Sequence, residues 1–452
     1  MARKQPIYVC SACGGEALKW QGQCPHCSAW NTLTRLTGVR PAAGESGAAA
    51  ARAALPVALA ADPPADTRLS LGMSELDRAF GGGLGPGSVS LLGGEPGIGK
   101  STLLLQVAAA VGLEHSVLYA SGEESTHQTS QRARRLGLSA PQLTLVSDNA
   151  LEAILDLSTA RHATLLLVDS IQTMQTRNAE TSPGSAQQLR ECTAALVRFA
   201  KQSGTAVIIV GHVTKDGTIA GPKLLEHLVD TVLYFDADAG SRYRMLRATK
   251  NRFGPVNELG FFAMTETGLR EVRNPSAIFL SRHPQPVPGS LVMVARDGGR
   301  PLLIEVQALV DHTRFATPRR VAQGVDANRL AMLLAVMSRH AGVSLADYDV
   351  YVNLVGGLEI TETATDLPLA LALASSLRGV ALPGTLVAFG ELGLTGEVRP
   401  VPYGEERLKE LHKQGYTTAI VPRLNAPRLG VEGVVVHPVG TLSEALAAAW
   451  PD

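Results

Sequence analysis

The segment Gly94-Glu95-Pro96-Gly97-Ile98-Gly99-Lys100-Ser101 fits the pattern G-x-x-x-x-G-K-[ST] and lies between an apolar strand-like run, Ser88 to Leu92, and a helix-like run, Thr102 to Val111. In such a unit the glycines let backbone N–H groups close around phosphates, the lysine offers a cation to the β and γ oxygens, and the hydroxyl ligates Mg²⁺. The helix N-terminus adds partial positive charge. The alternative is a Gly-rich turn that matches by chance. The pattern predicts a nucleoside triphosphate site that runs from Gly94 to Thr102, with Lys100 also acting in catalysis.

Length and composition limit the class of protein. The 452 residues suffice for two to four domains, and 45% are hydrophobic. No apolar stretch approaches the roughly 20 residues of a membrane span, and no apolar segment follows the basic start of the chain. We therefore expect a soluble, cytoplasmic protein without a membrane partner. Lys plus Arg and Asp plus Glu both number 41, so any nucleic-acid contact must use local patches.

Four cysteines near the N-terminus predict a metal site. Cys10, Cys13, Cys24 and Cys27 form a C-x₂-C-x₁₀-C-x₂-C pattern, whose paired knuckles suit tetrahedral thiolate coordination of Zn²⁺. Two disulfides are the alternative. We expect a zinc-binding module over residues 1–36 that depends on the metal for its stability. The Ala-, Pro- and Gly-rich residues 37–66 read as a flexible linker.

The remaining chain divides into two predicted domains. Over residues 67–273 apolar strands alternate with helical segments, which is typical of a mostly parallel sheet flanked by helices. A Pro-rich stretch near residue 285 marks the next boundary. Residues 274–452 again alternate strand-like and helix-like runs, so a second α/β or α+β domain is expected.

Further candidate residues follow predicted strands of the first domain. Leu165 to Val168 is an apolar run that ends at Asp169, a candidate Mg²⁺ ligand opposite Ser101. Glu123 follows another strand and is a candidate for orienting or deprotonating the attacking water, although spacing alone cannot separate it from Glu124. His212 ends a third strand and is a candidate γ-phosphate contact, with a plain strand-end histidine as the alternative.

Several motifs together resemble one family. They are Leu71 to Asp77, Gly81 to Leu84, the phosphate loop Gly94 to Ser101, Tyr119 to Ser125, and the pentapeptide Lys250-Asn251-Arg252-Phe253-Gly254. This set is similar to bacterial RadA (Sms) proteins, RecA-related ATPases of DNA repair, and the resemblance covers nearly the whole chain. It implies a RecA-like core that binds ATP and Mg²⁺ and assembles into a homo-oligomer, a hexameric ring.

The resemblance also implies an activity and partners. A protein of this family would move on single-stranded DNA and extend heteroduplex in branched recombination intermediates, with the RecA recombinase as a partner. Lys250 and Arg252 would reach across a subunit interface to the neighbour's γ-phosphate as catalytic cations. DNA would contact the loops Gln172 to Gln187 and Thr214 to Pro222. A solvated basic turn and disordered connections are the respective alternatives.

The C-terminal domain resembles the proteolytic domain of Lon, a ribosomal S5 domain 2-like α/β fold. Aligning Asp366-Leu-Pro-Leu-Ala370 with the Lon motif places Leu369 at the position of the nucleophilic serine, and Glu405 falls near that of the lysine base. Neither residue can perform that chemistry, so we expect a proteolytically inactive scaffold. Arg314, Arg319, Arg320 and Arg329 are candidate phosphate contacts. An ATP-dependent protease and a non-motor RecA-like regulatory ATPase remain the alternative functions.

Overall fold

The computed structural model describes the following residues: 7–10, 16–17, 19–25, 28, 30, 33–36, 68–179, 181–212, 225–237, 241–256, 258–281, 285–297, 299–356 and 360–450. The chain separates into two compact units, Met1–Pro63 and Pro64–Asp452. Several predicted features lie outside the described residues, namely Cys13, Cys27, the linker 37–66 and the predicted DNA loop from Thr214 to Pro222. The boundary between the two units falls within this linker.

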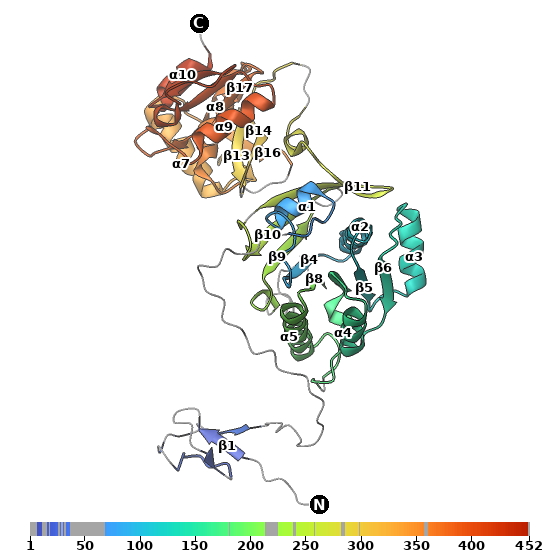
Figure 1. Ribbon diagram of the computed structural model, residues 1–452. Helices are drawn as coiled ribbons and strands as arrows, with labels where there is room; N and C mark the ends of the chain where they lie inside the picture. The colour runs from blue at the N-terminus through green and yellow to red at the C-terminus, as the bar shows by residue number, and fades with distance from the viewer. Residues whose placement is uncertain are drawn as a thin grey trace, which may run out of the picture. The chain divides into compact units, whose positions relative to one another are not determined.

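Apolar runs of the predicted first domain form one nine-stranded sheet (Figure 1). In spatial order its strands are β12 (Gly268–Glu271), β11 (Leu259–Thr265), β10 (Tyr243–Asn251), β9 (Thr231–Asp236), β4 (Val89–Gly94), β8 (Ala206–His212), β7 (Leu165–Asp169), β5 (Val117–Ser121) and β6 (Leu143–Ser147). The strands from β9 to β6 pair in parallel, and β10, β11 and β12 add antiparallel pairs. The prediction of a mostly parallel sheet is confirmed.

Helices cover both faces of this sheet, because successive side chains of a strand point to opposite faces and both sets are apolar in its central strands. Leu165 and Leu167 pack in one buried cluster and Leu166 and Val168 in another. The first cluster includes residues of α1 (Ser74–Ala79) and α2 (Lys100–Val111), with α3 (Thr126–Arg135) packed against it. The second includes residues of α4 (Leu151–Ala160) and α5 (Ala186–Ser203). The sheet thus lies in the middle of three layers. Because the strands from β9 to β6 are parallel, their carboxyl ends lie together at one edge.

The C-terminal part contains a seven-stranded mixed sheet. Its strands, in spatial order, are β15 (Arg320–Gln323), β16 (Tyr348–Leu354), β14 (Arg300–His312), β13 (Ser290–Asp297), β17 (Leu386–Ala388), β20 (Thr418–Pro422) and β21 (Val435–Val439). One face packs against α7 (Ala327–Ala341), α8 (Asp366–Arg378) and α10 (Leu442–Ala449), and the other against α9 (Gly404–Lys413). A short hairpin, β18 (Glu391–Leu392) and β19 (Val398–Arg399), completes the domain.

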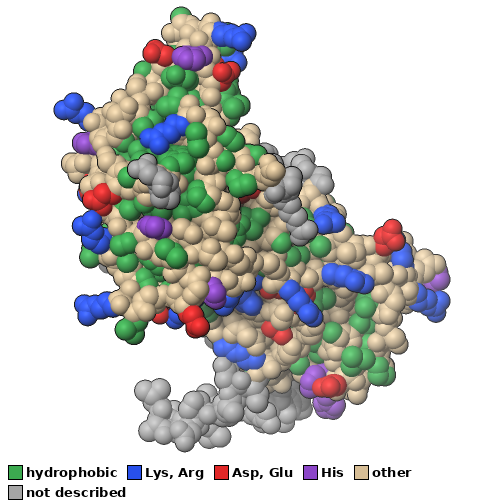
Figure 2. All heavy atoms as spheres, turned by 90° about the horizontal axis from the view of Figure 1, so that it is seen from above, with side chains coloured by type: hydrophobic (Ala, Val, Ile, Leu, Met, Phe, Trp, Pro, Cys, Tyr) green, Lys and Arg blue, Asp and Glu red, His purple; other side chains and the backbone are tan. Residues whose placement is uncertain are grey.

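The N-terminal unit contains a small antiparallel sheet in the order β2 (Glu16–Ala17), β1 (Ile7–Cys10), β3 (Leu33–Leu36). Within the described residues of both units, no helix is long and apolar enough to cross a membrane. Lys and Arg side chains are scattered over the face shown in Figure 2.

Candidate active site

The phosphate loop joins β4 to α2 at the carboxyl edge of the sheet. Gly94 has φ +155°, and a Cβ there would lie 2.8 Å from the carbonyl oxygen of Phe235. Gly99 precedes α2 with φ +117°, and its Cβ would lie 2.7 Å from Cε of Met264. Both positions therefore require glycine, for reasons of backbone conformation and of space. Between them Glu95, Pro96 and Gly97 are exposed, so the loop is open to a ligand.

Lys100 lies inside this loop and is only 3% exposed. Its ammonium donates hydrogen bonds to the carbonyl oxygens of Gly94 at 2.7 Å and Glu95 at 2.8 Å. Burial lowers the pKa of Lys100 to about 8, against the opposing attraction of Asp169, Glu123 and Glu95. The lysine thus sits among carboxylates and carbonyls in a poorly solvated place, where phosphate oxygens would be strong acceptors.

Asp169 ends β7 and is buried. Its Oδ2 accepts a hydrogen bond from the hydroxyl of Tyr119 at 2.6 Å. Burial raises the pKa of Tyr119 well above its usual value, and the charge of Asp169 raises it further, so the phenol keeps its proton. Tyr119 therefore fixes one carboxylate oxygen of Asp169. Ser101 and Thr102 occupy the first turn of the neighbouring helix α2 and are half-buried.

Glu123 and Glu124 have different surroundings. Oε1 of Glu123 accepts a hydrogen bond from Oγ of Ser170 at 2.6 Å and lies 3.0 Å from Nε2 of His212. Burial opposes ionisation of Glu123, but the hydrogen bonds from Ser170 and His212 and the charges of His212 and Lys100 outweigh it and lower its pKa. Glu124 instead forms an ion pair with Arg132 of α3. Of the two carboxylates that the sequence could not separate, Glu123 is the one that belongs to the Lys100 and His212 cluster.

Four predicted residues thus meet at one edge of the sheet. Lys100, Glu123, Asp169 and His212 come from the carboxyl ends of β4, β5, β7 and β8, which are neighbours in the order β4, β8, β7, β5. Parallel strands bring their carboxyl ends to the same edge, which is where open α/β sheets bind ligands.

Lys250 and Arg252 lie elsewhere. Asn251 pairs with Thr231 of β9, and Thr231 pairs with Ser90 near the start of β4. This register puts the pentapeptide at the amino edge, about 13 Å along β4 from Gly94 at the strand rise of about 3.3 Å per residue. Lys250 and Arg252 therefore cannot serve the phosphate loop of their own chain.

The two cations also differ in accessibility. The ammonium of Lys250 donates to the carbonyl oxygens of Glu226 at 2.6 Å and Val229 at 2.8 Å. Burial and the nearby charge of Arg252 lower the pKa of Lys250, against the attraction of Asp230 and Glu226. The side chain of Arg252 is 57% exposed and is paired with Asp230. Arg252 is thus the more accessible of the two.

Sequence reasoning missed three residues of the site. Tyr119 and Ser170 orient the two carboxylates, and Arg244 of β10 donates from Nε to the carbonyl oxygen of Ile98 in the phosphate loop at 3.1 Å. Ser170 directly follows Asp169, so its place after a strand was a usable signal. No sequence motif near Arg244 predicts this contact, because Arg244 lies on β10, and the antiparallel strands of the sheet bring it to the phosphate loop.

The described part of the predicted zinc module is compatible with a metal knuckle. Cys24 is buried, and the backbone N–H of Ser28 donates to the carbonyl oxygen of Cys24 at 2.9 Å, which closes a turn. Cys10 is the last residue of β1. The other two predicted ligands are outside the described residues, so the four-cysteine site stays a prediction.

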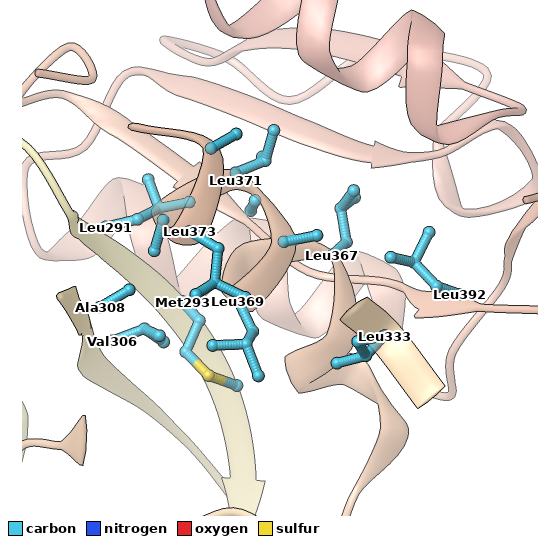
Figure 3. Close-up of a cluster of buried hydrophobic side chains, with 14 of the residues drawn as sticks. Leu291, Met293, Val306, Ala308, Leu333, Leu367, Leu369, Leu371, Leu373 and Leu392 are labelled. Carbon is cyan, nitrogen blue, oxygen red and sulfur yellow. The ribbon is translucent and has the colours of Figure 1, made fainter. Parts of the chain in front are cut away.

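The two positions that align with the nucleophilic serine and the lysine base of Lon hold residues that cannot perform those roles, Leu369 and Glu405. Leu369 on α8 is fully buried in the hydrophobic cluster, and Figure 3 shows it near Met293 of β13. Glu405 is 66% exposed and pairs with Lys409 at 2.8 Å. An aliphatic group inside a core cannot act as a nucleophile.

The predicted phosphate contacts of this domain have partners of their own. Arg329 forms an ion pair with Asp366 at the start of α8. Arg320 donates to the carbonyl oxygens of Leu345 and Tyr348, and Arg319 stacks on the ring of Phe315. Arg314 is exposed.

In the first predicted DNA loop, Arg177 is exposed and its backbone N–H donates to Glu152 at 3.1 Å.

Models of three protein families match successive parts of the chain. Residues 8–35 match a rubredoxin metal binding domain, residues 63–218 an AAA domain, and residues 326–425 the subunit ChlI of Mg-chelatase. The crystal structure of the RadB recombinase matches 45% of this chain and 100% of its own, at 25% identity and a TM-score of 0.37.

Full-length relatives establish the family. The chain is 53% identical over 445 residues to the DNA repair protein RadA of Haemophilus influenzae, with 97% of each chain covered. It is 51% identical to the proteins of that name from Pseudomonas aeruginosa, with 100% of each chain covered, and Escherichia coli, with 97% of each chain covered. The chain therefore belongs to the RadA family of DNA repair proteins, and it joins a RecA-like P-loop ATPase core to an N-terminal zinc-ribbon segment and a Lon-protease-like C-terminal domain.

Proposed function

We propose that this protein is a DNA-dependent ATPase motor that translocates on single-stranded DNA and promotes branch migration of recombination intermediates. Membership of the RadA family supports a role in recombinational repair. The observation that carries the motor proposal is that the phosphate loop lies at one edge of the sheet, whereas the exposed Arg252 lies at the opposite edge. If Arg252 acts in hydrolysis, it would have to act on the phosphate loop of a neighbouring subunit, and a site shared in this way would link hydrolysis to rearrangement of the subunits.

The chain's own residues account for the chemistry of hydrolysis. Lys100 would bind the β and γ oxygens, and Ser101 and Asp169 would hold Mg²⁺, which neutralises charge that develops on the phosphates. Ser170 and His212 hold Glu123 and lower its pKa, so it is ionised and would orient the attacking water or accept a proton from it. His212 ends β8, which lies between β4 and the strands that lead to Asp169 and Glu123, and this position suits a γ-phosphate contact.

Arg252 and Lys250 would complete the neighbour's site in a homo-oligomer, expected to be a hexameric ring. An exposed guanidinium can donate to phosphate oxygens in trans and is strongly preferred for that task. Lys250 would first have to give up its carbonyl acceptors. We therefore assign the direct role to Arg252 and leave Lys250 as a second candidate.

The other parts of the chain would supply the partners. The four cysteines Cys10, Cys13, Cys24 and Cys27 would bind Zn²⁺ and hold the module that contacts a recombinase such as RecA. The C-terminal domain would act as a scaffold for assembly and DNA binding and not as a protease, since Leu369 is an aliphatic core residue.

The test uses purified full-length protein and a three-stranded branched DNA intermediate. The motor proposal predicts ATP-dependent extension of the heteroduplex and ATP hydrolysis stimulated by single-stranded DNA, both lost in Lys100→Ala. Equal hydrolysis with and without DNA would favour a regulatory ATPase that binds proteins. Branch migration that persists in Lys100→Ala would refute the motor. ATP-dependent turnover of casein would instead identify a protease.

A further inference from the structure

The exposed Arg252 is held by a buried carboxylate that also binds a second cation. Asp230, directly before β9, has a side chain only 5% exposed. Its Oδ1 accepts a hydrogen bond from Arg252 at 3.1 Å, and its Oδ2 accepts one from Nζ of Lys201 at 2.9 Å and one from the backbone N–H of Val89 at 3.1 Å. The backbone N–H of Arg252 donates to the carbonyl oxygen of Asp230 at 3.1 Å. Asp230 is therefore a common acceptor for the cations of Arg252 and Lys201.

The backbone around Arg252 is fixed independently of its guanidinium. Arg68 donates to the carbonyl oxygen of Phe253 at 2.7 Å, and the side chain of Asn251 donates to that of Phe80 at 3.2 Å. A Cβ at Gly254 would lie 2.9 Å from Cα of Gly81, so this side of the turn is closely packed. The guanidinium can consequently leave Asp230 while the turn stays in place.

A buried carboxylate is strongly destabilised when it loses its only counter-ion, and this penalty would keep Arg252 bound to Asp230. Lys201 removes that obstacle, because its side chain at the end of α5 is 50% exposed and stays bound to the other carboxylate oxygen. Once Arg252 leaves, Asp230 still has one full positive charge and the N–H of Val89. The pairing of one carboxylate with two cations thus lets one cation depart at low cost.

We propose that Asp230 is a positioning residue for Arg252, and that Lys201 is the replacement counter-ion that allows Arg252 to leave Asp230 and engage the nucleotide of a neighbouring subunit. This inference rests on the proposed shared site. It adds that Arg252 has two alternative acceptors, the carboxylate of its own chain and the phosphates of its neighbour.

The test measures kcat and KM for ATP in the full chain with single-stranded DNA present. Among the described residues, Lys201→Met leaves Arg252 as the one cationic side chain hydrogen-bonded to Asp230. We therefore expect kcat to fall about tenfold while KM stays within about twofold, because the phosphate loop is untouched. Lys201→Arg keeps the charge and should retain kcat. Lys409→Met, which removes an exposed paired lysine from the C-terminal domain, is the matched control and should equal the parent.

The combination with Asp230→Asn separates charge exchange from a structural role. With a neutral side chain at residue 230 there is no carboxylate to leave unpaired, so Lys201→Met should cause no further loss beyond that of Asp230→Asn alone. Two losses that multiply, or a Lys201→Met variant with the parent kcat, would overturn the inference. If Lys201→Met lowers the thermal unfolding midpoint and Lys201→Arg fails to restore kcat, the lysine is structural and the inference also fails.

Arg252→Ala distinguishes this inference from the shared site itself. If Arg252→Ala retains the parent kcat, the shared site is wrong. If Arg252→Ala loses kcat and Lys201→Met does not, the shared site stands and only the counter-ion exchange is wrong.

Discussion

Nucleotide affinity should fall about tenfold between pH 7 and pH 9, because Lys100 loses its proton in this range. Burial lowers the pKa of Lys100 from 10.5 to about 8, despite the nearby carboxylates of Asp169, Glu123 and Glu95. At that pKa about nine-tenths of the molecules carry the ammonium at pH 7 and about one-tenth at pH 9. Phosphate binding requires the ammonium, and the apparent Kd rises as the competent fraction falls.

The sign of this effect follows from the direction of the shift. Phosphates raise the pKa of Lys100 again, so above pH 8 binding must take up a proton, and affinity decreases as pH rises. The loss of about tenfold corresponds to about 1.4 kcal/mol.

Fluorescence titration with a non-hydrolysable ATP analogue at pH 7, 8 and 9 measures this change in Kd. Calorimetry in buffers of different ionisation enthalpy should report uptake of about 0.1 proton at pH 7 and about 0.9 at pH 9. Lys100→Arg is the control, since a guanidinium does not titrate in this range. A Kd of the parent protein that is constant from pH 7 to pH 9, or an equal slope in Lys100→Arg, would refute the reasoning.

Three further substitutions test individual contacts. Glu123→Gln should lower the single-turnover rate of ATP hydrolysis about 10²- to 10⁴-fold with little change in nucleotide Kd, and an equal loss in Glu124→Gln would contradict the choice between the two carboxylates. Tyr119→Phe removes the hydroxyl that donates to buried Asp169 and should lower the free energy of unfolding by about 1–3 kcal/mol in urea titrations; no change would mean that this hydrogen bond is not formed. Leu369→Ala should lower it by about 2–5 kcal/mol, whereas a loss below about 1 kcal/mol would place Leu369 outside the core.

The parts of the site that the sequence predicted best are those formed by residues that are contiguous in the chain. The phosphate loop needs a strand, a glycine loop and a helix in immediate succession, and the sequence between Ser88 and Val111 predicts all three. Asp169 follows an uninterrupted apolar run, which marks a buried strand and hence the edge where its side chain emerges.

Contacts that depend on long-range pairing were not predictable in the same way. The choice between Glu123 and Glu124 depends on Ser170 and His212, which come from two other strands, and on Arg132 in the following helix. Spacing in the sequence says nothing about which of two adjacent side chains faces these groups.

The pairing of Arg252 with Asp230 could not be predicted from the sequence, for a related reason. The register of β10 against β9 shifts between Ala248 and Lys250, so one residue of β10 is left over there. A bulge of this kind changes the direction of the residues that follow it and leaves no signature in the sequence. Asp230 itself appears in the sequence only as one more acidic residue before a strand.

The most direct test of the shared site mixes two defective proteins. Lys100→Ala lacks a working phosphate loop but can supply Arg252, and Arg252→Ala has the converse defect. If the subunits exchange at random in an equal mixture, about one quarter of the interfaces combine an intact loop with an intact arginine. We expect each variant alone to be inactive and the mixture to hydrolyse ATP at about one quarter of the parent rate. A mixture no more active than its components, or full activity of Arg252→Ala alone, would contradict the account.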